Sequence, residues 1–134
     1  MTSRRTIDSV TDVIQRAAQA EPGLSLLVLH GSRARGGAHA SSDWDFAFIG
    51  DTGLDADGLL ARLGEAVHSD VIDLADLNRA TGLLRFNAAS DGLLVFEREP
   101  GTFNRFRLDA ISAWLDMAAV LGSAYDARLE RLTK

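Results

Sequence analysis

The sequence contains no cysteine and only two prolines. Without cysteine the chain can form neither a disulfide framework nor a thiolate zinc site, and this composition fits a reducing cytoplasm. No apolar run approaches the roughly 18 residues that a membrane-spanning helix needs. Arg4 and Arg5 stand near the start, but no apolar core of signal-peptide length follows them. We therefore expect a cytoplasmic protein with no membrane partner.

Basic residues are also scarce, since 14 Lys and Arg face 19 Asp and Glu, giving a net charge of -5 and a pI near 5.0. Nucleic-acid binding rests on clustered Lys and Arg, so we expect no direct nucleic-acid partner. A length of 134 residues with 46% hydrophobic content suits one ordinary core. Repeats, low-complexity segments and linkers are absent from the sequence. We expect a single domain over residues 1–134.

The most informative stretch is residues 31–50, GSRARGGAHASSDWDFAFIG. The apolar run before it, Leu24 to His30, has the length of a buried strand, so the Gly31-Ser32 pair falls where that strand ends. Phe46 to Ile49 is again strand-like and places Asp43 and Asp45 near the start of a second strand. Because side chains alternate across a strand, the two aspartates share one face and Trp44 points to the other.

Two carboxylates on one face repel each other unless a positive charge lies between them. No Lys or Arg separates them, so a hard divalent cation is the simplest partner. Gly31 allows close backbone approach, and its N-H groups with the Ser32 hydroxyl can hold phosphate oxygens. A third acid, Asp73, lies in the strand-like run 70–77. Three acids would suffice for a site with two metal ions.

This ordered set of Gly-Ser, ten residues, Asp-x-Asp and a lone strand Asp is similar to the nucleotidyltransferase superfamily typified by DNA polymerase beta. The GSRARG and SDWDF segments and the short chain resemble a minimal nucleotidyltransferase (MNT), the type that serves as antitoxin of HEPN toxins. The resemblance extends from about Leu24 to about Glu97. It implies an α+β fold in which helices flank a small mixed sheet of about four strands, with a long C-terminal helix.

The resemblance implies transfer of AMP from ATP to a hydroxyl group, with release of pyrophosphate and with two Mg²⁺ ions as cofactor. Asp43 and Asp45 would hold both ions, and Asp45 with Asp73 would frame the ion that activates the acceptor hydroxyl. Asp73 is also the candidate for receiving the acceptor proton. In this family the acceptor is a tyrosine of the cognate HEPN ribonuclease toxin, which the AMP group silences.

Phosphate binding is expected from the segment that follows the first strand. Gly31, Ser32 and one of Arg33 and Arg35 would orient the beta- and gamma-phosphates, since arginine suits bidentate phosphate contacts. Residues 32–36 could form a helical turn whose N-terminus faces these phosphates. The sequence does not decide between the two arginines, because either could instead pair with a nearby carboxylate.

Histidines and the other aspartates are given no chemical role by the sequence. His30 could hydrogen-bond near the phosphate turn or serve structure alone, and His39 reads as a solvated loop residue. His68 suits the C-terminus of a helix. Five further aspartates near the second and third strands are expected to be solvated, capping or turn residues: Asp51, Asp55, Asp57, Asp70 and Asp76.

Periodicity predicts the rest of the chain. We expect a fourth strand over 92–99 and helices over 6–20, 59–68, 78–89 and 102–134, the last being either continuous or broken near Gly122. Its first half should cover the sheet. The part beyond Gly122 is either further core or a partner surface, and Trp114 and Tyr125 are residues of the kind that anchor interfaces.

Two other functions remain open. A purely binding antitoxin would block the toxin by its surface and use its acids only for structure or nucleotide sensing. A transferase acting on a small hydroxylated molecule, such as an aminoglycoside, usually carries an additional helical domain for the drug, which this chain lacks.

Overall fold

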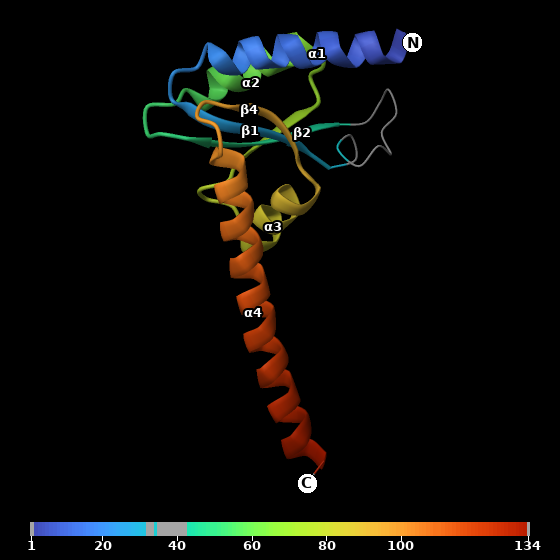
Figure 1. The fold of residues 1–134 in the computed structure, drawn as a ribbon, viewed down its shortest axis with the longest axis vertical. Coiled ribbons are helices and arrows are strands. Elements are labelled where there is room, and N and C mark those ends of the chain that lie inside the picture. The colour runs from blue at the N-terminus through green and yellow to red at the C-terminus, as the bar shows by residue number, and fades with distance from the viewer. Residues whose placement is uncertain (1, 32–33, 35–42, 134) are drawn as a thin grey trace.

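The computed structural model describes residues 2–31, 34 and 43–133 of the chain, with side chains for 10–31, 34, 43–124, 126–128 and 130–131. Its centre is a four-stranded sheet in the order β3-β2-β1-β4 (Figure 1). β1 (Leu24–His30) is antiparallel to both β2 (Trp44–Gly50) and β4 (Leu93–Glu97). β3 (Ile72–Asp76) is parallel to β2. The mixed sheet expected from the sequence is therefore confirmed.

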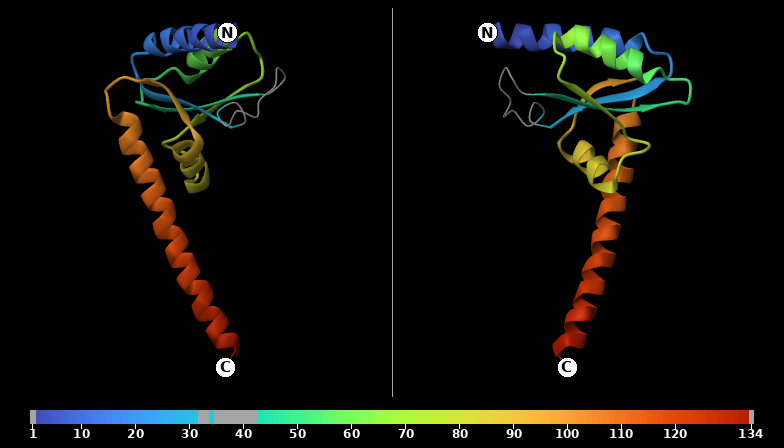
Figure 2. Two further views of the ribbon diagram at one scale, coloured as in Figure 1. Left: turned by 45° about the vertical axis from the view of Figure 1, so that its right-hand side comes forward. Right: turned by 180° about the vertical axis from the view of Figure 1, so that it is seen from behind.

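Helices cover both faces of the sheet (Figure 2). α1 (Thr2–Gln19) and α2 (Ala56–Val67) lie on one face, and α3 (Gly82–Asp91) with the first turns of α4 (Thr102–Thr133) lies on the other. Local caps fix where these helices begin. Asp55 accepts from the backbone N-H of Gly58 at the start of α2, and Thr81 accepts from that of Leu84 at the start of α3.

The start of α3 differs from the prediction. Residues 78–81 form a turn rather than the first helical turn, because the Asp76 side chain accepts from the Asn78 backbone N-H at 2.9 Å. Such an aspartate-initiated turn competes with helix. The predicted helix over 78–89 therefore begins later, at Gly82, and continues to Asp91.

Two apolar clusters occupy the two faces of the sheet. The cluster below α1 and α2 contains Leu27, Phe46 and Phe48, whereas the cluster below α3 and α4 contains Val28 and Ala47. Neighbouring residues of one strand thus point to opposite clusters, as the alternation of a strand requires. A slip of one residue would exchange the two faces and expose buried Phe and Leu side chains, each worth about 1.5 to 3 kcal/mol. The register of β2 is thereby strongly specified.

α4 is one continuous helix of 32 residues, about 48 Å long, and it is not broken at Gly122. Phe103, Phe106 and Ala110 are buried against the sheet, and Trp114 stacks on Phe86 of α3 with ring centroids 5.5 Å apart. Every described side chain beyond Trp114 is exposed, and this part of α4 projects away from the body (Figure 1). No helix in the described part of the chain has the length and apolar character to span a membrane.

Candidate active site

Asp43, Asp45 and Asp73 come from two neighbouring strands. Asp45 lies in β2 directly opposite Asp73 of the parallel strand β3, and Asp43 precedes β2 by one residue. Between these strands the backbone N-H of Trp44 donates to the Val71 carbonyl at 3.1 Å. The connection through α2 makes β3 run parallel to β2. Asp45 and Asp73, 28 residues apart in the sequence, are therefore paired across the two strands.

The packing of adjacent residues shows which face these acids occupy. Trp44 and Ile72 pack against the cluster below α1 and α2, and Trp44 stacks on Phe46 with centroids 6.0 Å apart. Ala47 and Ala75 belong to the other face. Asp45 and Asp73 each lie two residues before one of these alanines, so strand alternation puts them on the face covered by α3 and α4. The prediction that Trp44 points away from the acids is confirmed.

The acids are accessible and carry no described countercharge. Asp43 and Asp73 are exposed, and Asp45 is half-buried. Among the described residues, no Lys, Arg or His forms an ion pair with any of them. Within the same residues, no three His, Asp or Glu side chains converge as metal ligands. The register therefore brings the acids together at the N-terminal ends of β2 and β3. Their side chains do not converge on a common point in the described part of the chain.

Gly31 follows β1 and lies against the Asp45 carboxylate. Its φ is +76°, in the left-handed region that glycine adopts at no steric cost. A Cβ built on Gly31 would overlap the Asp45 Oδ2 and lie 3.1 Å from its Cγ. Only glycine therefore lets the turn after β1 come this close to the acid, which agrees with the close approach expected from the sequence.

Ser32, Arg33 and Arg35 lie outside the described residues, and so do His39 and most of the helical turn expected over 32–36. Their assignment to phosphate binding stays a prediction from the sequence.

His30 is a residue whose surroundings the sequence could not resolve. It is the last residue of β1 and lies directly opposite Asp45 in the antiparallel ladder. Its Nε2 is buried and has no hydrogen-bond partner in the described part of the chain. The signal in the sequence was its place immediately before the Gly-Ser turn, at the end of an apolar strand.

The other aspartates have the structural roles expected of them. Asp55 caps α2, and Asp51 accepts from the backbone N-H of Gly53 at 2.9 Å. Asp76 accepts from Asn78 and lies 3.9 Å from the guanidinium of Arg79. Asp57 is exposed in the first turn of α2.

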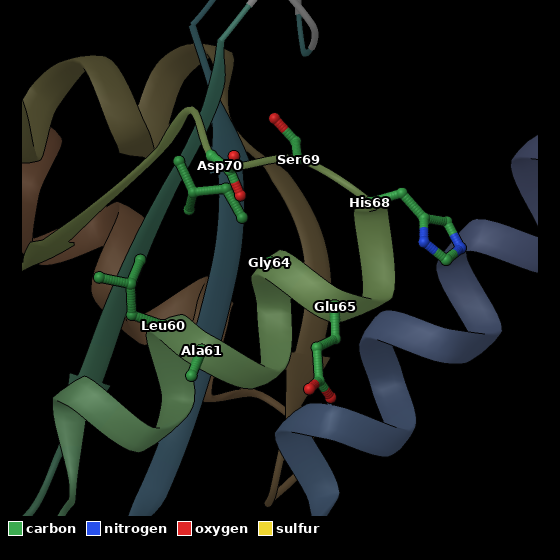
Figure 3. Close-up of a pocket in the computed structure, with 8 residues that line it drawn as sticks. Leu60, Ala61, Gly64, Glu65, His68, Ser69 and Asp70 are labelled. Atoms are coloured by element: carbon green, nitrogen blue, oxygen red, sulfur yellow. The ribbon is translucent and has the colours of Figure 1, made fainter.

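Asp70 lines a hollow between the end of α2 and the segment leading into β3 (Figure 3). His68 and Glu65 also line this hollow, and all three side chains are exposed. The hollow is bordered by Ile72, which packs toward α1 and α2. It therefore lies on the opposite face of the sheet from Asp73.

The chemistry of the donor set fits a hard divalent cation. Three carboxylates at one edge of a sheet provide the oxygen ligands that Mg²⁺ prefers, and the shell would be completed by water and phosphate oxygens. The turn at Gly31 packs directly against the Asp45 carboxylate, where the Cβ of any other residue would overlap it. Asp43, Asp45 and Asp73 are the residues that would hold such an ion.

Comparison with known proteins agrees with this geometry. The family model described as "Polymerase beta, Nucleotidyltransferase" matches residues 12–101. The chain is 34% identical over 114 residues to the protein adenylyltransferase MntA of Aphanizomenon flos-aquae (strain 2012/KM1/D3), with 76% of each protein covered.

Solved structures share the fold. A chain of a toxin-antitoxin complex with AMP-PNP superposes with a TM-score of 0.71 at 25% identity, over 89% of this chain and 98% of that one. A chain of the complex between tri-AMPylated HEPN toxin of Shewanella oneidensis and MNT antitoxin gives a TM-score of 0.65 at 22% identity, over 90% and 96%. The chain is a nucleotidyltransferase that belongs to the polymerase beta nucleotidyltransferase family, and within it to the minimal nucleotidyltransferases that include MntA.

Proposed function

We propose that this protein transfers AMP from ATP to a hydroxyl group of a cognate HEPN toxin, a tyrosine in the family it resembles, and so acts as the toxin's antitoxin. The observation that carries the proposal is the pairing of Asp45 with Asp73 beside the close turn at Gly31. The substrate classes are supported by the relative named protein adenylyltransferase and by the complexes with AMP-PNP and with AMPylated HEPN toxin.

The residues divide the reaction between them. The acceptor oxygen attacks the alpha-phosphorus of ATP, the bond from that phosphorus to the bridging oxygen of the beta-phosphate breaks, and pyrophosphate leaves. Asp73, exposed at the edge strand, is accessible for the acceptor proton. Asp43 and Asp45 would bind the Mg²⁺ ions, whose positive charge favours deprotonation of the acceptor and the developing charge on phosphate.

The turn after β1 would orient the phosphates of ATP. The backbone at Gly31 approaches Asp45 closely enough that a nucleotide bound there would contact both the turn and the acid edge. Ser32 and one of Arg33 and Arg35 would add donors to the beta- and gamma-phosphates. Holding both reactants in line supplies much of the acceleration in phosphoryl transfer.

The projecting part of α4 is the surface that we propose binds the toxin. Its described apolar side chains include Leu115 and Leu121, which are 58% and 61% exposed. We assign this surface to the toxin, because large exposed apolar side chains on a helix that leaves its own body mark a partner-binding surface. The same surface would also serve an antitoxin that acts by binding alone.

Intact-mass spectrometry of the cognate toxin tests the proposal. The toxin is incubated with this chain, ATP and Mg²⁺, and we expect its mass to rise in steps of one AMP group. The Asp43→Asn/Asp45→Asn variant should give no increase, whereas the matched Asp70→Asn/Asp76→Asn variant should act like the wild type. An unmodified toxin that is nevertheless silenced in a stable complex would favour the purely binding antitoxin.

A further inference from the structure

His30 combines burial with an unsatisfied hydrogen-bonding atom. Its Nε2 is shielded from solvent and has no partner among the described residues. A buried polar atom without a partner destabilises the folded state, and an apolar side chain of similar shape would not. The position therefore carries a cost in stability that an apolar residue would avoid.

Asp45 is the polar side chain placed to satisfy this atom. The two residues are partners in the β1-β2 ladder, so their side chains leave the sheet on the same face. Residues opposite each other in an antiparallel pair have Cβ atoms roughly 4.5 to 5.5 Å apart. No hydrogen bond or ion pair between described residues occupies the Asp45 carboxylate.

The Asp45 carboxylate has little freedom on its other side. The turn at Gly31 lies against its Oδ2, and Asp73 is its neighbour on β3. A carboxylate that binds a metal ion with one oxygen needs its other oxygen fixed, and protein donors around metal ligands commonly do this. His30 is the described histidine that the ladder places next to Asp45.

We propose that His30 is a positioning residue for Asp45. Its Nε2-H donates a hydrogen bond to the Asp45 carboxylate when that carboxylate binds a divalent cation, and so holds the acid in its metal-binding orientation. This inference rests on the proposed metal-dependent function. It adds a role for the residue before the Gly-Ser turn.

Metal binding by three variants tests this role. His30→Phe fills the same space without a donor, His30→Gln restores an N-H donor, and His68→Gln is the matched control at the exposed end of α2. Mn²⁺ affinity in the presence of AMP-PNP, measured by electron paramagnetic resonance, should fall about 10- to 100-fold in His30→Phe. His30→Gln should recover most of the loss, and His68→Gln should match the wild type.

Structural and positioning roles give different results. A histidine that only fills space predicts unchanged Mn²⁺ affinity in His30→Phe, and that result would overturn the inference. Should His30→Phe fail to fold, the wild-type protein labelled with ¹⁵N-histidine gives the answer. The Nε2-H resonance of His30 should shift on addition of Mg²⁺ and AMP-PNP, and no change in it would contradict the proposal.

The same samples separate this inference from the proposed function. AMP transfer to the toxin by wild-type protein, followed by mass, tests the function itself. Normal transfer with unaltered Mn²⁺ affinity in His30→Phe would remove only the role of His30. Strong Mn²⁺ binding that depends on His30, without any transfer, would instead remove the toxin as acceptor. A wild-type protein that binds no Mn²⁺ would overturn both.

Discussion

Asp45 is surrounded by residues from two separate segments of the chain. His30 at the end of β1 lies opposite it on one side, Asp73 of β3 lies opposite it on the other, and the turn at Gly31 lies against its carboxylate. It is half-buried, whereas Asp43 and Asp73 are exposed. We therefore expect Asp45 to be the most constrained of the three acids, and Asp73 to be free to meet an acceptor.

Replacing Asp73 with Asn should remove the proposed proton acceptor and one proposed metal ligand while preserving the shape of the side chain. We expect AMP transfer to the toxin to slow by at least about 100-fold, measured as the rate of mass increase. Asp76→Asn is the matched control, because it changes an acid of the same strand that points to the other face and keeps the acceptor for Asn78. Equal rates for the two variants would contradict the proposed role of Asp73.

Gly31→Ala should damage stability and site together. The φ of +76° costs an L-residue about 1 to 2 kcal/mol, and the added methyl group would displace the Asp45 carboxylate. We expect a lower urea midpoint of unfolding and weaker Mn²⁺ binding. Gly53→Ala is the comparison, since its Cβ would meet no atom closer than 3.4 Å. Unchanged metal binding in Gly31→Ala would show that the close approach is dispensable.

At the scale of elements, α4 has two parts with different environments. The residues up to Trp114 are held by the sheet and α3, whereas the described side chains beyond it are exposed. A helix without packing depends on its own propensity and capping. The two parts should therefore differ in local stability, and the projecting part should gain protection when the toxin binds.

Gly122→Ala should stabilise the projecting part of α4. No atom of the described residues lies within 4 Å of a Cβ built at this position, and alanine in a helix interior is favoured over glycine by about 0.5 to 1 kcal/mol. Amide hydrogen exchange between Leu115 and Arg131 should slow several-fold, with little change in the core strands. Faster exchange would indicate that the glycine has a contact that this structure does not show.

Leu121→Asp should weaken capture of the toxin. Leu121 is 61% exposed on α4, and a buried charge in an apolar interface is strongly unfavourable. We expect at least a tenfold higher dissociation constant by calorimetry, with an unchanged unfolding temperature. Ser123→Asp adds the same charge to another side of the helix and should have a smaller effect. Equal affinity in Leu121→Asp would place the toxin elsewhere.

At the scale of the whole molecule, stability and chemistry occupy opposite ends of β1. The His30 end faces the acids, whereas the Leu24 end is fastened by Arg98, which donates from Nε to the Leu24 carbonyl and from Nη2 to the Glu21 carbonyl, each at 2.8 Å. Glu21 is buried and also pairs with Arg62 of α2 at 2.5 Å. One set of polar contacts thus joins α2 and the start of β1 to the residues that follow α1 and β4.

Arg98→Ala should therefore lower stability without changing the site. Two carbonyl groups would lose a charged donor, so we expect a loss of about 1.5 to 3 kcal/mol in the free energy of unfolding. Mn²⁺ affinity should remain within about twofold of wild type at a temperature where the variant is folded. A large loss of metal affinity would mean that the two ends of β1 are coupled.

The sequence by itself determined the local elements and the acids. The apolar run Leu24–His30 became β1 with the predicted bounds, because the run itself and the flanking Pro22-Gly23 and Gly31 are local properties. Asp43, Asp45 and Asp73 were likewise identified as candidates from the sequence, and together with Gly31-Ser32 they carried the resemblance to the family. The roles of these acids, like those of Ser32, Arg33 and Arg35, remain predictions from the sequence.

Tertiary structure decided which residues meet. The pairing of Asp45 with Asp73 and with His30 depends on strand order and register, which arise from contacts between residues distant in the sequence. The later start of α3 depended on the turn that the Asp76 side chain forms with Asn78. α4 continues through Gly122 because the residues on both sides of this glycine are helical. A local pattern describes only neighbours in the chain. The burial of the unpartnered Nε2 of His30 depends on strand pairing, and it could therefore not be predicted from the sequence.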